Sequence, residues 1–595
     1  MSNQDPDRQR ISGSGRFQDA LCQETARWQG EALVERMWAK DAKLWTGGDE
    51  TKWLGWLDIV ALQQERLAHF DALARMAAKE FTDVVILGMG GSSLCSKVLV
   101  ESFTGLGGRP RLHILDSTVP AQITRLEAAL DPRRSLFIVA SKSGVTIESN
   151  LLYQYFFDRV KTQLGERAGE HFIAITDPGS TLEAIAKRHG FRMLIHGLPS
   201  IGGRFSALSD FGLVPAAILG LDVSRLLNRA AEMVQECGPT SSVVNNPGVQ
   251  LGLTLALAGA DGRDKVTFIA SSGVKAFGSW LEQLIGESTG KDGRGLILVE
   301  GESVGSPEDY GDDRVFVSLE LDPENGQESV SLVGGLESAG HPIVRIKLRD
   351  AYDLGQEFFR WELATAVAGV VLGVNPFNQP DVEMGKVATK TLTDQLESRG
   401  SLSVERPCAE GQGLRMFADA RYLVTLQSET DSVDRLMRSH LDSLRLGDYF
   451  ALLAYLDMNL INTEVLSRIR HAVREVQKVA TCLNFGPQYL HSTGQLYKGG
   501  PNTGVFLEVT ADDAVDLPIP GLAYSFGALN MAQARGDFVV LSELKRRVIR
   551  VHLGADVATG LVKLERVVHQ ALAHGSSDLK NSCLLYTSPS PRDRG

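Results

Sequence analysis

The chain has 595 residues, 43% of them apolar, which is enough to bury several cores, and about 150 residues per domain gives two to four domains. Its 61 basic and 73 acidic residues give a net charge of −12, and no block dense in lysine and arginine stands out, so nucleic acid is not an expected partner. The six cysteines form no CxxC pair, which disfavours a disulfide framework or a zinc site and indicates a reducing compartment.

The first 80 residues are predicted to be helical, because apolar residues recur every three or four positions at 21–40 and 57–79. The extreme N-terminus lacks the apolar core of a signal peptide. The most apolar helical stretch, 361–374, is too short to span a bilayer. We therefore expect a cytoplasmic protein with no membrane partner.

From residue 84 onward, short apolar runs alternate with amphipathic stretches. This regular alternation of strands and helices indicates parallel sheets covered by helices on both faces. The first series of runs is VVIL (84–87), LHIL (112–115), LFIVA (136–140), FIAIT (172–176) and RMLIH (192–196). The second series is VTFIA (266–270), LILVE (296–300), VFVSLEL (315–321) and PIVRIKL (342–348), and VFLEV (505–509) is a further candidate strand.

These patterns divide the chain into two α/β domains with additional segments at both ends. We predict a helical N-terminal segment at 1–80, a first domain at 81–240 and a second domain at 245–400. Residues 401–578 are expected to complete the second domain and its site. At 580–595 the composition shifts to serine and proline without an amphipathic pattern, so we expect a non-native tail there.

The motif GMGGSS at 88–93 follows the first predicted strand and opens a helix. Glycine lets a backbone turn tightly and approach a ligand, and the free N–H groups of a helix N-terminus attract anions. Dinucleotide sites have a related pattern, and Asp116 stands near the position of their ribose-binding carboxylate, although Ser93 replaces the third glycine. A dinucleotide site and a tight turn without a ligand therefore stand as alternatives.

The motif SKSGVT at 141–146 lies between another buried strand and a helix. Hydroxyl groups, a glycine and free helix-end amides at one turn are typical of a phosphate cradle. The chain has no GxxxxGK[ST] motif, which excludes a P-loop for nucleoside triphosphates. The alternative is that these serines and threonine only cap the helix.

Two charged residues stand in loops rich in glycine. Arg204 follows Gly202 and Gly203, where a fixed cation can approach a developing anion, and a plain salt bridge is the alternative. Glu287 lies in GESTGK at 286–291, after an apolar helical stretch, where a carboxylate can serve as a general base. A solvated glutamate near the end of a helix is the alternative there.

Together the motifs resemble those of the phosphoglucose isomerase family. GMGGSS, SKSGVTIES, IGGRFSALSDFG, GESTGK and NPFNQPDVEMGK occur in this order, each at a strand end or in a loop. The resemblance covers about residues 20–575 and is closest to the isomerase half of fused transaldolase/phosphoglucose isomerase proteins. It implies an α/β fold with two doubly wound parallel-sheet sugar-isomerase (flavodoxin-like) domains, and interconversion of glucose 6-phosphate and fructose 6-phosphate through a cis-enediolate.

The resemblance also implies a role for each motif residue. Glu287 would shuttle a proton between C1 and C2, while Arg204 would stabilise the enediolate and keep Glu287 ionised. Lys386 would lie near the ring oxygen. The sugar would be lined by Gly90, Gly91 and Ser92. The phosphate would be held by Ser141, Lys142, Ser143 and Thr146.

The ring-opening histidine is where the sequence departs from the family pattern. Family members have this histidine before the lysine motif, but no suitable histidine lies between Glu287 and Lys386, since His341 lacks the surrounding motif. The best candidate is His491, in the polar segment 489–496, whose sequence resembles the fused subgroup. Imidazole suits acid–base chemistry near neutral pH. A structural histidine is the alternative.

The expected reaction needs a base, a fixed cation and a phosphate anchor, and it requires no metal or nicotinamide cofactor. A phosphosugar is the expected partner. The family resemblance also implies that the chain can form a homodimer. Three alternatives stand: another phosphosugar isomerase, a noncatalytic phosphosugar-binding sensor, and the isomerase part of a truncated bifunctional protein. The first 80 residues are too short for the transaldolase barrel of about 250 residues.

Overall fold

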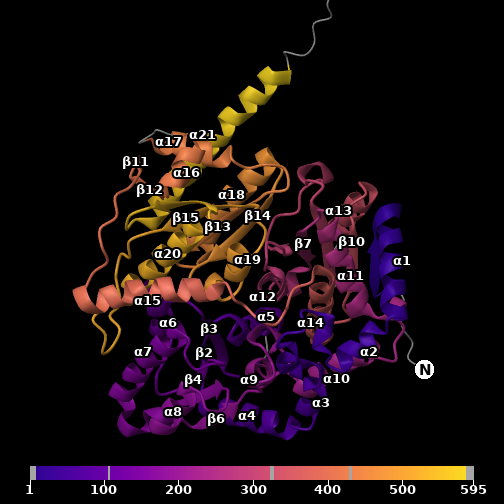
Figure 1. The fold of residues 1–595 in the computed structure, drawn as a ribbon. Helices are drawn as coiled ribbons and strands as arrows, with labels where there is room; N and C mark the ends of the chain where they lie inside the picture. Colours follow the sequence, from indigo (N-terminus) through magenta and orange to yellow (C-terminus); the bar gives the residue numbers. More distant parts are fainter. Residues whose placement is uncertain (1–7, 105–106, 322–326, 428–431, 584–595) are drawn as a thin grey trace, which may run out of the picture.

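The structure is a computed structural model that describes residues 8–104, 107–321, 327–427 and 432–583. Three β-sheets with flanking helices make up the fold (Figure 1). The doubly wound α/β architecture expected from the sequence is confirmed, because the central strands of every sheet are parallel and helices connect them. Most of the predicted non-native tail, 584–595, lies outside the described residues.

The first sheet consists of five parallel strands in the order β3-β2-β4-β5-β6. Its strands are β2 (Asp83–Gly88), β3 (Arg111–Leu115), β4 (Ser135–Ala140), β5 (Phe172–Thr176) and β6 (Met193–His196). Its helices are α5 (Leu94–Ser102), α6 (Pro120–Ala128), α7 (Ile147–Leu164), α8 (Thr181–Arg188) and α9 (Asp210–Leu219). Numbered within the sheet, the order is 2-1-3-4-5, which is the flavodoxin-like order. Val84 and Ile86 pack toward α5 and α9, whereas Val85 and Leu87 pack toward α7 on the other face.

The second sheet repeats this order with four parallel strands and gains an antiparallel edge strand. Its strands are β1 (Gln9–Ser12), β7 (Lys265–Ala270), β8 (Ile297–Val299), β9 (Arg314–Glu320) and β10 (Ile343–Lys347), in the order β1-β10-β9-β7-β8. Its helices are α10 (Val223–Glu236), α11 (Pro247–Ala260), α12 (Phe277–Thr289), α13 (Gln327–Ser338) and α14 (Leu354–Leu372). Strand β1 comes from the segment predicted to be helical, whose helices are α1 (Gly15–Gly30), α2 (Leu33–Trp38), α3 (Ile59–Gln64) and α4 (Leu67–Glu80).

The segment predicted to complete the second domain forms a third sheet, in the order β11-β12-β16-β15-β13-β14. Its strands are β11 (Ala409–Gly411), β12 (Leu414–Ala418), β13 (Tyr449–Tyr455), β14 (Ala480–Phe485), β15 (Gly504–Thr510) and β16 (Arg547–His552). Its helices are α15 (Val382–Arg399), α16 (Ala420–Thr425), α17 (Val433–Leu441), α18 (Leu460–Gln477), α19 (Gly494–Gly499), α20 (Phe526–Glu543) and α21 (Val557–Cys583). Within the described residues these strands form ladders only with one another. The sequence analysis recognised β15 as a candidate strand but none of the other strands of this sheet, including the central β13, whose fully buried run has no alternation.

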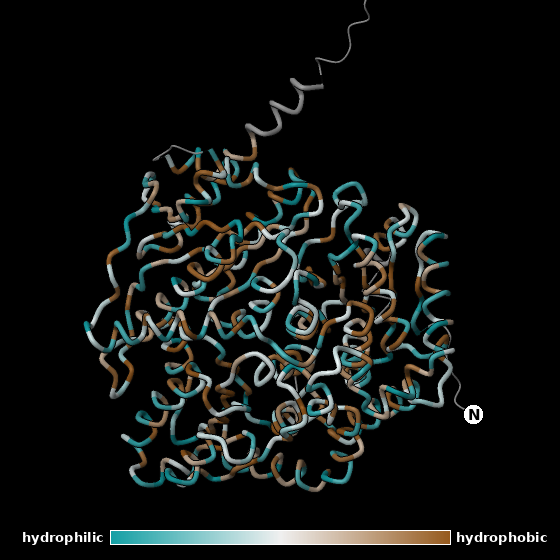
Figure 2. Tube along the Cα trace, viewed as in Figure 1, coloured by the Kyte–Doolittle hydropathy of each residue, from teal (hydrophilic) through white to brown (hydrophobic). Residues whose placement is uncertain are grey.

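The third sheet is joined to the rest through one of its faces. Leu453 and Phe506 on that face share a core with Ile297 and Val299 of β8. In Figure 1, α15 runs along the boundary between the third sheet and the first domain, beside α20. Apolar residues gather in the sheets and central helices, and outer turns are mostly hydrophilic (Figure 2). No helix among the described residues is long and apolar enough to cross a membrane.

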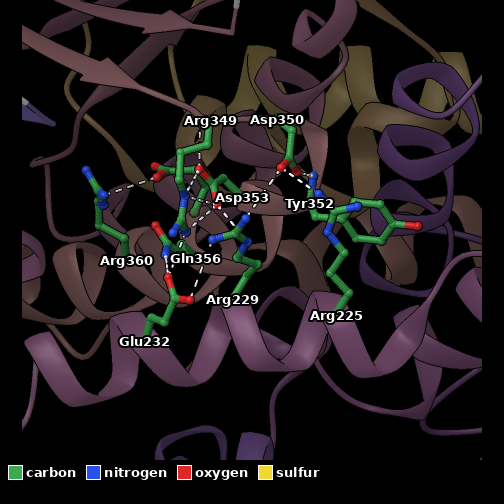
Figure 3. Close-up of polar contacts among 10 residues, drawn as sticks. Arg225, Arg229, Glu232, Arg349, Asp350, Tyr352, Asp353, Gln356 and Arg360 are labelled. Atoms are coloured by element: carbon green, nitrogen blue, oxygen red, sulfur yellow. Dashed lines mark hydrogen bonds and ion pairs between the residues drawn. The ribbon is translucent and has the colours of Figure 1, made fainter. Parts of the chain in front are cut away.

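A network of charged side chains fixes the start of α14 against α10 (Figure 3). The guanidinium of Arg349 donates through Nε and Nη2 to Asp353, at 2.9 and 2.6 Å, and through Nη2 to Glu232 at 2.7 Å. Asp353 is 1% exposed, and Nε of Arg229 lies 3.4 Å from its Oδ1. The network therefore holds α14 in place, and the loop that follows α14 supplies contacts to the site described next.

Candidate active site

Two of the predicted motifs lie at the switch point of the first sheet. Strands β2 and β4 are neighbours, yet the chain leaves them through α5 on one face and α7 on the other. Ligands of open α/β sheets bind in the crevice at such a point. The segments 88–93 and 141–146 follow these two strands directly.

Gly90 and Gly91 allow two distant loops to pack directly against the first motif. A Cβ atom on Gly90 would lie 2.6 Å from the carbonyl oxygen of His491, and the φ angle of Gly90 is +54°. A Cβ atom on Gly91 would lie 2.1 Å from the carbonyl oxygen of Gly203. Ser92 follows them, half-buried, just before α5. The glycines thus bring together the loops that carry His491 and Arg204.

The segment 141–146 forms a turn lined with hydroxyl groups at the N-terminus of α7. The buried Ser141 hydroxyl donates to Oγ1 of Thr146 at 3.0 Å and accepts from the amide of Gly144 at 3.1 Å. Gly144 has a φ of +72°, which favours glycine. Ser143 is exposed. Free hydroxyl and amide groups at a helix N-terminus suit a phosphate group.

Lys142 from the same turn is held by an ion pair. Its ammonium donates to Oδ2 of Asp177 and, at 3.2 Å, to the carbonyl oxygen of Leu198. Its side chain is 19% exposed. The positive charge is therefore close to the phosphate-type turn but already paired with one carboxylate.

The side chain of Arg204 is fixed on every nitrogen. Nε donates to Oγ of Ser288 at 2.7 Å, and Nη1 donates to Oε1 of Gln379 at 3.1 Å. Nη2 donates to the carbonyl oxygens of Pro376 and Asn378, at 2.6 and 2.9 Å. Arg204 is 2% exposed, so this is a preorganised cation.

Glu287 lies on the last turn of α12 and is bound at both of its oxygens. Oε1 lies 3.1 Å from Nη1 of Arg204. Oε2 accepts from Nε2 of Gln283 at 3.0 Å, and the same nitrogen donates to the carbonyl oxygen of His491 at 2.8 Å. The carboxylate remains 12% exposed, so a ligand can reach it. Gln283 thus connects the predicted base to the loop of the predicted ring-opening residue.

His491 forms an ion pair with a buried carboxylate that the sequence analysis did not single out. Its Nε2 lies 2.9 Å from Oε1 of Glu148, in the first turn of α7. The same oxygen accepts from Nε2 of Gln533 on α20 at 2.6 Å. Gln533 is itself held by the hydroxyl of Thr118 at 3.2 Å. The histidine is therefore oriented by groups from the first sheet and from the third.

Burial and neighbouring charges shift the pKa values of His491, Glu148 and Arg204 in different directions. Burial lowers the pKa of His491, but the carboxylate of Glu148 outweighs burial, so the pKa of His491 is raised. Burial likewise raises the pKa of Glu148, yet the charge and hydrogen bond of His491 bring it below its usual value. Burial lowers the pKa of Arg204, and the opposing charge of Glu287 reduces that effect. His491 and Glu148 thus each favour the charged form of the other.

Lys386 lies at the exposed edge of this arrangement. Its ammonium donates to Oε1 of Glu383 at 2.5 Å, and its side chain is 60% exposed. Its charge lowers the pKa of His491, which places it within electrostatic range of the imidazole. The start of its helix is fixed by Gln495 of α19, whose Oε1 accepts from the amide of Asp381 at 2.9 Å.

Three residues of the site were missed by sequence reasoning: Glu148, Gln283 and Gln379. Gln283 precedes Glu287 by four positions on one helix, a spacing that places both on the same face and provides a usable signal. Glu148 and Gln379 lie within motif segments that were recognised. Their partners are far away in the chain, so no local pattern could reveal their contacts.

The carboxylate of the dinucleotide alternative is occupied by a contact within the protein. Asp116, the candidate ribose-binding carboxylate, is 4% exposed, and its Oδ2 accepts from Nε2 of Gln488 in the loop after β14. Burial raises the pKa of Asp116. Among the described residues, no group of three or more His, Cys, Asp or Glu side chains is placed to hold a metal ion.

Comparison with known proteins agrees with this geometry. A family model described as phosphoglucose isomerase matches residues 69–298, which include the phosphate-type turn, Arg204 and Glu287. A glucose-6-phosphate isomerase from Carboxydothermus hydrogenoformans is 27% identical over 393 residues, covering 57% of this chain and 84% of that protein. A glucose-6-phosphate isomerase from Thermus thermophilus is 30% identical over 388 residues, covering 58% of this chain and 91% of that protein.

A solved structure also matches this chain over most of its length. The crystal structure of a hypothetical protein from Thermus thermophilus superposes with a TM-score of 0.55 at 28% identity, covering 64% of this chain and 99% of that chain. These matches span less of the chain than the resemblance expected over residues 20–575.

Proposed function

This chain belongs to the phosphoglucose isomerase family, and from that premise we propose that it interconverts glucose 6-phosphate and fructose 6-phosphate. The observation that carries the proposal is the pairing of Glu287 with Arg204 at 3.1 Å, beside a turn suited to phosphate. An aldose–ketose isomerisation moves a proton between two carbons next to a carbonyl, which requires one positioned base and one fixed cation.

We assign substrate binding to the two loops of the first sheet. The phosphate is held by the hydroxyls of Ser141, Ser143 and Thr146 and by the helix N-terminus, with Lys142 adding charge. Because the phosphate does not react, its binding energy orients the sugar carbons toward Glu287. We assign the sugar to the first motif, at Gly90, Gly91 and Ser92, where the glycines let the loops that carry His491 and Arg204 pack closely around the site.

The proton transfer is assigned to Glu287. Its carboxylate removes the proton from C2 of the aldose, and the electrons move into the carbonyl oxygen to give the cis-enediolate. The hydroxyl proton moves from O2 to O1, and Glu287 returns the carbon-bound proton to C1 as the C2 carbonyl forms, which yields the ketose. Arg204 stabilises the enediolate charge, and its fixed hydrogen bonds mean that little reorganisation is needed during the reaction.

Ring opening is assigned to His491, with Glu148 holding the imidazole. The cyclic sugar opens when a proton reaches the ring oxygen as the bond to C1 breaks. An imidazolium with a raised pKa is a suitable donor for this step. Lys386 is assigned to the neighbourhood of the ring oxygen, although in this structure its ammonium is paired with Glu383.

The test is a coupled assay with fructose 6-phosphate on the purified chain without added metal. We expect glucose 6-phosphate to form at a rate that saturates with substrate. Binding without turnover would indicate the sensor instead. A panel that includes mannose and amino-sugar phosphates separates the proposed activity from other phosphosugar isomerases.

Two further expectations accompany the proposal. We propose a homodimer, which size-exclusion chromatography with light scattering would detect, and a cytoplasmic location. A relationship to fused transaldolase/phosphoglucose isomerase proteins also stays a prediction.

A further inference from the structure

A second polar pocket of about 220 Å³ lies in the unit of the third sheet. Arginines line it from three different elements: Arg415 on β12, Arg535 on α20 and Arg550 on β16. Its volume corresponds to about seven water molecules at about 30 Å³ each, enough for a small anion and part of a larger ligand. Its residues lie outside the segment matched by the family model and take no part in the proposed isomerisation.

A strap of residues 400–408 joins α15 to β11 and covers this pocket. The carboxylate of Glu405 in the strap lies between two of the arginines. Its Oε2 accepts from Nη2 of Arg550 and lies 3.0 Å from Nε of Arg535. Arg535 also donates from Nη1 to the carbonyl oxygen of Ser403 at 2.9 Å. The carboxylate of Glu405 in the strap is thus bound by the guanidinium groups of Arg535 and Arg550.

Of the two arginines that hold Glu405, Arg550 is built into the core, and Arg535 keeps 11% of its side chain exposed. Arg550 is 2% exposed and packs with its guanidinium 4.4 Å from the ring centre of Phe417 and 5.4 Å from that of Phe538. Its buried Nε has no hydrogen-bond acceptor among the described residues. A buried donor without an acceptor is costly, so a ligand that supplies a second oxygen would stabilise this group.

We propose that this pocket is a second binding site for a phosphoryl group of a small phosphorylated metabolite, which replaces the Glu405 carboxylate between Arg535 and Arg550. The charges match this chemistry. With Glu405 displaced, three guanidinium groups face the single carboxylate of Asp512, leaving a surplus of two positive charges for a dianionic phosphoryl group. Guanidinium forks also bind phosphoryl oxygens in a bidentate manner.

Helix α20 lies between the pocket and the active site and contacts both. Met531 and Arg535 line the pocket, while Gln533, about 200° further round the helix from Met531, donates to Glu148 on the opposite side. Glu148 in turn holds His491. The strap leads into α15, the helix that carries Lys386. An anion that displaces the strap therefore acts on α20, which helps to orient His491, and on the segment that leads into α15, and on this basis the site is assigned a regulatory role.

The binding test is equilibrium dialysis of radiolabelled orthophosphate against the full chain at constant ionic strength. Glu405→Gln removes the competing carboxylate, so we expect at least about tenfold tighter phosphate binding at this pocket. Arg535→Gln removes one guanidinium, so we expect at least about tenfold weaker binding. Arg468→Gln is the matched control, because Arg468 forms a similar ion pair with Glu565 in the same unit but does not line the pocket.

Equal phosphate affinity in the wild type and in either pocket variant would overturn the proposal. Should Arg535→Gln fail to fold by circular dichroism, Glu405→Gln decides alone, since it keeps all three arginines. Regulation is tested by kcat at saturating fructose 6-phosphate, where competition at the active site vanishes. We expect kcat to change with phosphate in the wild type and to stay constant in Arg535→Gln, and a kcat independent of phosphate in both would refute regulation.

Discussion

Nε2 of His491 lies 2.9 Å from Oε1 of Glu148, although the two residues are 343 positions apart in the sequence. Glu148 stands two positions after the last residue of the phosphate-type turn, on the first turn of α7. The contact therefore ties the third sheet to the phosphate end of the site. The phosphate-type turn and the carboxylate that holds the imidazole therefore lie at the same helix N-terminus.

We predict that Glu148→Gln shifts the pH dependence of catalysis. Without the carboxylate, burial is opposed only by the weaker effect of Glu287, so the pKa of His491 falls. If the protonated imidazole opens the ring, kcat/KM then declines at lower pH than in the wild type. Profiles of kcat/KM against pH measure this, with the exposed Glu166→Gln as control. Superimposable profiles for wild type and Glu148→Gln would remove Glu148 from this role.

We predict that Glu287→Gln abolishes measurable turnover while phosphosugar binding survives. The amide keeps the shape of the side chain but cannot accept the C2 proton, and loss of a general base costs at least about 10²-fold in kcat. Fructose 6-phosphate titration and the coupled assay on one sample give both quantities. Full activity would show that another group is the base.

Arg204→Lys is predicted to lower kcat/KM by about 10²- to 10³-fold, although the charge is kept. An ammonium cannot reproduce the fork that reaches Ser288, Gln379 and the carbonyl oxygens of the loop after α14. Steady-state kinetics and thermal unfolding of the variant are the measurements. Wild-type kcat/KM would mean that a positive charge alone suffices.

Gly91→Ala is predicted to impair catalysis through packing. The new methyl group would lie 2.1 Å from the carbonyl oxygen of Gly203 and push the Arg204 loop away. We expect a fall in kcat and a lower unfolding temperature. Gly202→Ala is the matched control, because a Cβ atom there meets nothing within 4 Å. An equal response of the two variants would argue against this packing explanation.

Asp353→Ala is predicted to lower the free energy of unfolding by about 3 kcal/mol, because it leaves Arg349 and Arg229 without their buried partner. Asp394→Ala removes a carboxylate from an exposed pair with Lys390, so we expect a change within about 0.5 kcal/mol. Urea unfolding monitored by circular dichroism compares the two. Similar values for both would show that the network in Figure 3 is not stabilising.

The parts of the fold with strong local patterns were predictable. The apolar runs of the first two sheets form strands, and the motifs at 88–93 and 141–146 follow their strands as expected, whereas Glu287 lies in the last turn of α12. The third sheet was not recognised, because the central run 449–455 is buried on both faces and has no alternation that distinguishes it from a helix. Strand β1 was missed because its pairing with β10 lies far away in the sequence.

The sequence by itself determined which residues are candidates for the site, since residue type and local geometry suffice to select them. A hydroxyl-lined turn before a helix, an arginine beside glycines and a glutamate at a helix end are local features. Only the tertiary structure decided which groups meet. The approach of His491 to Glu148, of Gln533 to the same carboxylate and of Glu405 to Arg550 depends on how separate sheets pack. The spacing of residues in the sequence does not reveal such contacts. They form when whole surfaces pack together, and the packing free energy does not depend on which residues are neighbours in the chain.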